Sequence, residues 1–120
     1  MFKAVFLLKK RPGMSVDDFK AYYEDTHAKL GERVLPTAER YVRRYLTPFP
    51  PVTPGQASEQ DVDVITEIWF KDRATFEGAV AKLQEPEIAA EITADEERLL
   101  DRSRIRLFTV EERESPLGKK

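Results

Sequence analysis

The most informative part of this sequence is the segment VDDFKAYYEDTHAKLGERV, which runs from Val16 to Val34. Its apolar positions recur at steps of three or four, at Val16, Phe19, Tyr23, His27, Leu30 and Val34. At about 100° per residue, these positions share one stripe along a helix. The exception to its apolar character is His27, the only histidine in the chain. A titratable imidazole among core residues either makes a purely structural hydrogen bond or takes part in catalysis.

Outward from this helix, the sequence predicts four strands and further helical segments. The strands are expected over residues 2–9, 41–46, 62–71 and 104–110. The first helix is expected over residues 16 to about 30, with an interruption at Gly31, and Ser15 precedes it as a near capping box. Asp72 is suited to cap a second helix, and Pro86 to open another helical segment.

The resulting order, β-α-β-β-α-β with an additional helical turn before the last strand, predicts an α+β fold. Such a chain builds a four-stranded antiparallel sheet with both helices on one face. The first, third and fourth strands carry apolar residues on both faces, although the helices cover only one. We therefore expect a homodimer packed through the open sheet face, and a monomer with an apolar open face is the alternative. The domain is expected to span residues 1–112, followed by a flexible tail at 113–120.

Composition and charge narrow the possible functions. With 120 residues the chain suits one domain, and its 20 basic and 22 acidic residues are interspersed, which disfavours nucleic-acid binding. The absence of cysteine and the single histidine disfavour disulfides and a zinc or transition-metal site. No stretch approaches the ~20 apolar residues that span a bilayer, so no membrane partner is expected. The apolar start precedes its basic residues, which is the reverse of a signal peptide, and a cytoplasmic location is expected.

Several short motifs together resemble the EthD-type domains of the dimeric α+β barrel superfamily. They are RPGMS at 11–15, FKAYYEDTHA at 19–28, IWFKD at 68–72 and DEERLLD at 95–101. The resemblance implies a ferredoxin-like subunit, a sheet-to-sheet dimer that forms an α+β barrel, and a cleft between sheet and helices. Many members have tryptophan where this chain has Tyr23, and proline where it has Lys29. The pocket is therefore expected to differ from theirs in shape and polarity.

The resemblance also implies a range of activities. Related barrels include cofactor-free isomerases of muconolactone type, polyketide cyclases and dehydratases, quinone-forming monooxygenases and proteins of unassigned role. Heme degradation and oxygen chemistry also occur on relatives of this barrel and stay open for this chain.

His27 is the candidate general acid or base, because an ordinary histidine titrates near neutral pH. Its best partner is Asp95, which shares a helical stripe with Ile88, Ile92 and Leu99 if the helix is unbroken. An unpaired carboxylate on such a stripe is costly to bury. The alternative is a capping box formed by Thr93 and Glu96, which would make Asp95 a first-turn acid instead.

Four further residues are candidates for binding a substrate. Tyr23 lies one helical turn before His27, so its hydroxyl could donate to a substrate carbonyl. Trp69 and Tyr41 could line an aromatic pocket, although a packed core or a dimer face explains them equally well. If the face that carries Arg43 points inward, its charge must meet a carboxylate, either of an acidic substrate or of a dimer salt bridge. The proline-rich connection over residues 47–61 is a candidate lid or rim.

These candidates support three hypotheses. The first is a small enzyme without cofactor, in which His27 moves a proton during dehydration, cyclisation or isomerisation of a small apolar carbonyl compound and Asp95 orients it. The second is a binding or accessory protein whose pocket holds a small ligand without turnover. The third is a structural dimer in which the histidine is inert.

Overall fold

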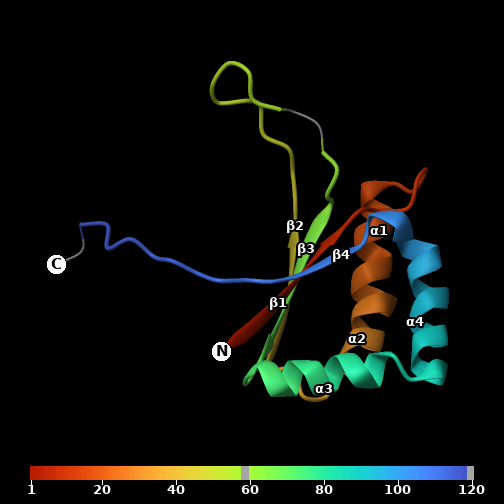
Figure 1. Ribbon diagram of the computed structural model, residues 1–120. Helices are drawn as coiled ribbons and strands as arrows, with labels where there is room; N and C mark the ends of the chain where they lie inside the picture. The colour runs from red at the N-terminus through yellow and green to blue at the C-terminus, as the bar shows by residue number, and fades with distance from the viewer. Residues whose placement is uncertain (58–59, 119–120) are drawn as a thin grey trace.

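The computed structural model describes residues 1–57 and 60–118 and shows an α+β fold. Four antiparallel strands form one sheet in the order β2-β3-β1-β4 (Figure 1). The strands are β1 (Phe2–Leu8), β2 (Arg40–Tyr45), β3 (Val64–Phe70) and β4 (Arg106–Thr109). This strand order and the helices described next make the chain ferredoxin-like, as the sequence predicts.

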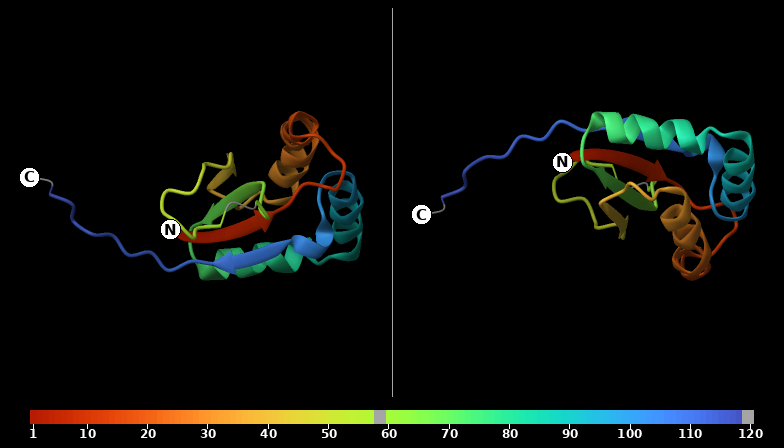
Figure 2. Two further views of the ribbon diagram at one scale, coloured as in Figure 1. Left: turned by 90° about the horizontal axis from the view of Figure 1, so that it is seen from above. Right: turned by 90° about the horizontal axis from the view of Figure 1, so that it is seen from below.

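The helices lie on one side of this sheet, as the two further views show (Figure 2). One continuous helix consists of α1 (Val16–Tyr22), a π-helical segment η1 (Tyr23–His27) and α2 (Ala28–Val34). Two more helices, α3 (Arg73–Leu83) and α4 (Pro86–Leu99), follow β3, and the short 3₁₀ helix η2 (Arg102–Arg104) leads into β4.

The predicted helix starts are confirmed. Ser15 caps α1 by accepting from the backbone N–H of Asp18, and Asp72 caps α3 in the same way through Thr75. Pro86 opens α4, where its missing N–H costs no helical bond. The extra segment before β4 is larger than the predicted single turn, since α4 has 14 residues.

Two predictions about the first helix are wrong. The helix is not interrupted at Gly31 but continues to Val34. Val16 is half exposed, so the helical stripe becomes a core face only from Phe19 onward. From there the stripe is buried at Tyr23, Leu30 and Val34.

The core lies between these helices and the sheet. In β3 every second residue is buried, because alternate side chains of a strand point to opposite faces. Val64, Ile68 and Phe70 face the helices together with Ala4 and Leu8 of β1. Leu99 of α4 is fully buried in the same layer, which fixes this helix against the sheet.

The opposite face of the sheet has no helix over it (Figure 1). By strand alternation its apolar side chains are those of Val5, Leu7, Val42, Ile65, Trp69 and Phe108. Charged residues share this open face, which is therefore less apolar than the sequence suggests. Lys3 and Arg40 both lie over the ring of Trp69, at 4.1 Å and 4.5 Å from its centre.

Two extended segments leave the body of the molecule. The connection between β2 and β3 projects beyond the end of the sheet (Figure 1), and Phe49 and Val52 on it are exposed. The C-terminal segment after β4 runs away in another direction as far as residue 118. Residues 58 and 59 of the predicted lid and residues 119 and 120 of the predicted tail lie outside the described range.

Candidate active site

The π-helical segment sets the geometry of the site. The backbone N–H of Ala28 donates to the carbonyl of Tyr23, five residues earlier. Each hydrogen bond of η1 therefore spans one residue more than in an α-helix, which widens the turn. In a regular α-helix Tyr22 and His27 would point about 140° apart. The wider turn instead directs both side chains toward α4.

Both of these side chains contact the carboxylate of Asp95. His27 Nδ1 lies 2.6 Å from Asp95 Oδ2, and the hydroxyl of Tyr22 donates to Oδ1 at 2.6 Å. The His27 and Asp95 side chains are only 13% and 9% exposed. Because an ionised carboxylate only accepts hydrogen bonds, Nδ1 carries the hydrogen in this pair. Within the described residues Nε2 has no hydrogen-bond partner, so it is available to a ligand.

The structure thus brings His27 and Asp95 together. The alternative of a capping box at Thr93 is wrong, because α4 runs unbroken from Pro86 to Leu99 and Thr93 lies in its middle. Sequence reasoning missed Tyr22 as a third member. Its position lies outside the α-helical stripe, and α-helical periodicity carries no signal for the π-helical turn that brings it to Asp95.

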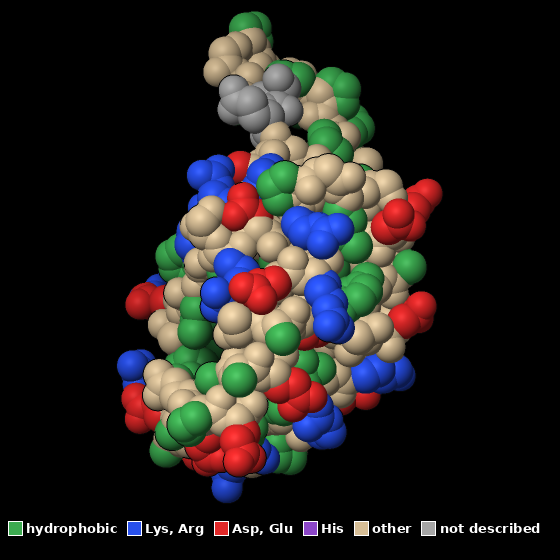
Figure 3. Space-filling view, turned by 90° about the vertical axis from the view of Figure 1, so that its right-hand side faces the viewer, with side chains coloured by type: hydrophobic (Ala, Val, Ile, Leu, Met, Phe, Trp, Pro, Cys, Tyr) green, Lys and Arg blue, Asp and Glu red, His purple; other side chains and the backbone are tan. Residues whose placement is uncertain are grey.

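His27 lines a small cavity between the helices and the sheet. The cavity has a volume of about 110 Å³ and mostly apolar walls. Its lining includes Phe6 and Ile68 from the sheet, Leu30 and Val34 from α2, Leu83 from α3 and Ile92 from α4. The helix-bearing surface outside it carries interspersed charges of both signs (Figure 3).

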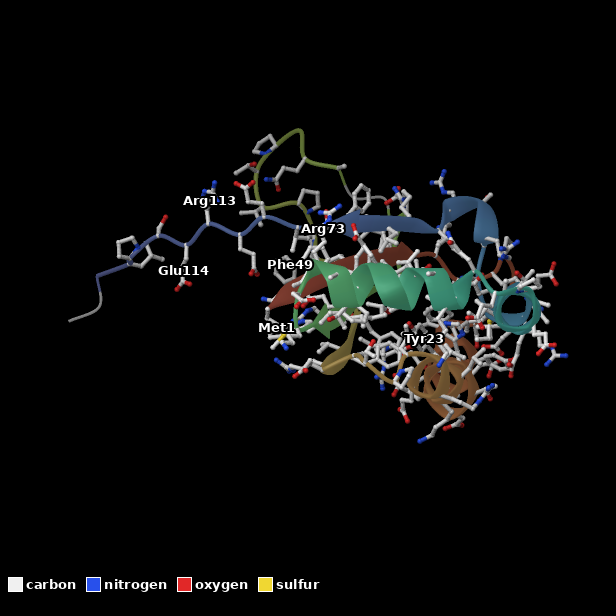
Figure 4. All side chains as sticks on the ribbon, turned by 60° about the horizontal axis from the view of Figure 1, so that its bottom comes forward. Met1, Tyr23, Phe49, Arg73, Arg113 and Glu114 are labelled. Atoms are coloured by element: carbon white, nitrogen blue, oxygen red, sulfur yellow. The ribbon has the colours of Figure 1, made fainter. Side chains whose placement is uncertain are left out.

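Besides His27, the polar part of the cavity wall consists of hydroxyl groups and of Glu96 of α4, which accepts from Arg102. Tyr23 lies among the side chains packed between the helices (Figure 4), and its hydroxyl is 2.5 Å from the hydroxyl of Thr66. Tyr41 lines the same cavity. Burial raises the pKa of both tyrosines, so their hydroxyls stay protonated and can donate. Tyr23 and Tyr41 therefore line the same cavity as His27.

Gly31 explains how Tyr41 reaches this position. A Cβ atom on Gly31 would lie only 2.7 Å from the Tyr41 hydroxyl oxygen and 2.8 Å from Cε2. The glycine in α2 thus makes room for the ring of Tyr41 rather than ending the helix.

Arg43 faces the helices but does not line the cavity. Its guanidinium donates through Nε and Nη2 to Glu24, at 3.1 Å and 2.5 Å, and Tyr45 donates to the same carboxylate at 2.6 Å. The charge of Arg43 is therefore met within the chain and not by a substrate or a partner. Arg43 holds the pKa of Glu24 below its ordinary value, since it hydrogen-bonds the ionised form.

Trp69 lies on the open face of the sheet, away from His27. Its neighbours Ile68 and Phe70 face the helices, so alternation along β3 excludes Trp69 from the cavity of its own subunit. That signal was already present in the sequence. The described residues of the 47–61 connection do not line the cavity either, so they form no lid over it.

Two further features are absent from the described parts of the chain. No group of three or more histidine, cysteine, aspartate or glutamate side chains there is arranged to hold a metal ion. No helix there has both the length and the apolar character to cross a membrane.

Comparison with known proteins identifies the family. The sequence profile of the EthD domain matches residues 11–103, which include both His27 and Asp95. The chain belongs to the EthD family. No curated protein sequence matches it.

Several solved structures have the same fold. An EthD family protein of Bacillus halodurans is 19% identical, with a TM-score of 0.64 over 94% of this chain and 100% of that one. HapK of Hahella chejuensis is 14% identical, with a TM-score of 0.59 over the whole of both chains. SnoaB of Streptomyces nogalater, a cofactor-independent oxygenase, is 14% identical, with a TM-score of 0.52 over 97% of this chain and 98% of that one. At these identities the likeness shows the fold alone. Membership in the EthD family fits a domain that binds or acts on a small molecule.

Gly31→Ala is expected to behave unlike an ordinary helical substitution in this EthD domain. Alanine stabilises a helix interior by about 0.5–1 kcal/mol relative to glycine. A Cβ atom on Gly78 in α3 would have no neighbouring atom within 4 Å, so Gly78→Ala should show that gain. Gly31→Ala should instead lower the free energy of unfolding below that of the wild type, because the ring of Tyr41 must move to admit the Cβ atom. Urea unfolding of both variants checks this, and equal stabilisation by the two would contradict the close approach.

The ion pair of Glu24 predicts a pH dependence of stability. Since its folded-state pKa is lowered, the stabilisation is complete above the ordinary glutamate value of about 4.3 and is lost as the pH falls through the lowered pKa. The difference in unfolding free energy between wild type and Glu24→Gln should therefore shrink on acidification from pH 7. Unfolding at a series of pH values measures it, with Asp25→Asn as an exposed control on the same helix. A difference that stays constant down to pH 3 would contradict the prediction.

Proposed function

We propose that this EthD domain is a small enzyme that needs no cofactor. In it His27 moves a proton during the dehydration, cyclisation or isomerisation of a small apolar carbonyl compound. The observation that carries the proposal is the His27–Asp95 pair on the wall of an apolar cavity. A histidine whose only task was to pack would not need a buried carboxylate on one nitrogen and a cavity at its ring.

The pair is arranged for general base catalysis. Asp95 holds the Nδ1 hydrogen, which leaves the lone pair of Nε2 for a proton of the substrate. When the imidazole takes that proton, the adjacent carboxylate stabilises the positive charge that forms. The same contact orients the ring, because a hydrogen bond at one nitrogen limits rotation of the side chain.

In a dehydration the steps balance without another reactant. Nε2 takes a proton from the carbon next to the carbonyl, and the C–H electron pair moves toward the carbonyl as an enolate forms. The enolate then expels a β-hydroxyl group, which takes the proton back from Nε2 and leaves as water. The hydroxyls of Tyr23 or Tyr41 can donate to the enolate oxygen, where charge develops.

The walls of the cavity support an apolar substrate. A volume of about 110 Å³ holds only part of a ligand of ordinary size, for which pockets run from ~300 Å³ upward. A second hollow of about 150 Å³, with apolar walls, shares Phe6, Leu35, Ile68 and Leu83 with the first. A ligand whose carbonyl lies near His27 would therefore extend its remainder along apolar surface.

Two considerations support an enzyme without cofactor. SnoaB is a cofactor-independent oxygenase, so the fold it shares with this chain accommodates such an enzyme. The cavity wall holds a base and hydroxyl donors, and the carboxylate that orients the base lies behind it, outside the lining. These are the groups that proton-transfer chemistry requires. The alternative proposal, a binding or accessory protein, uses the same pocket without turnover.

His27→Ala is expected to abolish catalysis and spare the fold. The assay measures the exchange of hydrogen for deuterium at the carbon next to the carbonyl in a panel of small ketones, β-hydroxyketones and lactones. NMR detects this exchange, which reports proton abstraction directly. The rate should fall by about 10²–10⁴-fold in His27→Ala and by a similar order in Asp95→Asn.

The matched control is Thr26→Ala, an exposed neighbour of His27 on the same helix that does not line the cavity. It should exchange protons at the wild-type rate. Ligand binding without exchange in the wild type would favour the binding protein, and undiminished exchange in His27→Ala would refute the role of His27.

We also propose that a second copy of the chain covers the open face of the sheet. Six apolar side chains lie there, and helices cover the other face. Apolar side chains gathered on an uncovered sheet face are typical of an association surface. The charges of Lys3 and Arg40 rest on Trp69, which leaves the apolar positions of β1 and β3 accessible to a partner.

Leu7→Glu is expected to dissociate this dimer. Leu7 lies on the open face of β1 beside Arg106, so a glutamate there is tolerated in a single subunit but is costly in a buried interface. Sedimentation velocity should give twice the chain mass for the wild type and the chain mass for the variant. Val16→Glu, half exposed on the helical side, should remain dimeric. A monomeric wild type would refute the proposal.

A further inference from the structure

Tyr22 contacts the buried pair from outside the cavity. Its hydroxyl donates to Asp95 Oδ1, whereas His27 occupies Oδ2. Tyr22 is absent from the cavity lining, so it does not touch a ligand bound beside His27. On the other side, Asp95 lines an open groove together with Arg98 of α4.

Resting on the function proposed above, we infer that Tyr22 is a positioning residue, which holds the Asp95 carboxylate in the plane that presents Oδ2 to His27. The terminal torsion of aspartate is broad, so a carboxylate with a single donor can turn out of the plane that aligns Oδ2 with Nδ1 of His27. Donors on both oxygens, each at 2.6 Å, leave one orientation. Asp95 in turn determines which nitrogen of His27 carries the hydrogen.

Local structure supports a specific role for this contact. Tyr22 and His27 flank the π-helical turn, and only the wider turn lets two residues five apart reach one carboxylate. Such turns are uncommon and often occur at functional sites. Burial and the neighbouring carboxylate raise the pKa of Tyr22, which keeps the hydroxyl a donor.

A purely structural role makes a different prediction. If the Tyr22 hydroxyl only satisfied a buried oxygen, its removal would lower stability and leave the tautomer of His27 unchanged. If it positions Asp95, its removal changes the hydrogen distribution on the imidazole. The single histidine makes this measurable without signal overlap, and no substrate is needed.

The experiment is a long-range ¹H–¹⁵N spectrum of the His27 ring, recorded at a pH where the ring is neutral. The wild type should show the Nδ1–H tautomer alone, and Tyr22→Phe a mixture with the Nε2–H tautomer. Tyr45→Phe removes a hydroxyl that donates to Glu24 instead, and should match the wild type. An unchanged tautomer in Tyr22→Phe, with a mixture in Asp95→Asn, would overturn the inference.

A second substitution covers the case in which Tyr22→Phe does not fold. Replacing Tyr22 by p-aminophenylalanine keeps the ring and a hydrogen-bond donor, so the wild-type tautomer should persist, and a mixture would overturn the inference. With a substrate found by the exchange assay, Tyr22→Phe should lower kcat by roughly 10-fold with KM unchanged. A shifted tautomer in a protein without turnover would refute the proposed function and leave the positioning role standing.

Discussion

The buried carboxylate of Asp95 is the constraint on which the site depends. A carboxylate whose side chain is only 9% exposed must receive hydrogen bonds, because an unpaired buried charge is costly. Its donors, His27 and Tyr22, both come from the continuous first helix, whereas Asp95 comes from α4. This buried polar contact therefore links the two helices, which an ion pair between Arg33 and Glu91 also joins at the surface. It also leaves the cavity-facing edge of the imidazole without a protein partner among the described residues.

The π-helical turn shows how local irregularity serves this contact. A regular helix would direct either Tyr22 or His27 at α4, but not both. The widened turn directs both there while Tyr23, between them, points at the sheet and meets Thr66. Gly31, one turn further on, has no side chain, and this leaves room for the ring of Tyr41, whose hydroxyl lies in the cavity wall with those of Tyr23 and Thr66. The imidazole and the hydroxyls of the cavity thus come from one irregular helix and two strands, and α4 adds Glu96.

The two faces of the sheet carry different kinds of side chain. Its helix-facing side carries the core, the cavity and the closed cluster of Arg43, Glu24 and Tyr45. Its open side carries apolar residues, with cations stacked on Trp69. Because strand side chains alternate, one strand supplies both sides, and β3 places Thr66 and Trp69 three residues apart in different environments. A ligand in the cavity and a partner on the open face would therefore not compete for the same residues of one subunit.

The sequence by itself determined the element types, the helix caps, the sheet composition, and the stripes that carry His27 and Asp95. These follow from the 3.6- and 2-residue periods and from capping chemistry, which act over a few neighbouring residues. The alternation of residues in β3 also predicts that Trp69 lies on the face opposite Ile68 and Phe70. Only the tertiary structure decided that His27 meets Asp95, that Tyr22 joins them, and that Glu24 takes the charge of Arg43. Periodicity states which residues share a face of one element, whereas these contacts depend on the separation and rotation of packed elements, and on a helical turn that departs from the period itself.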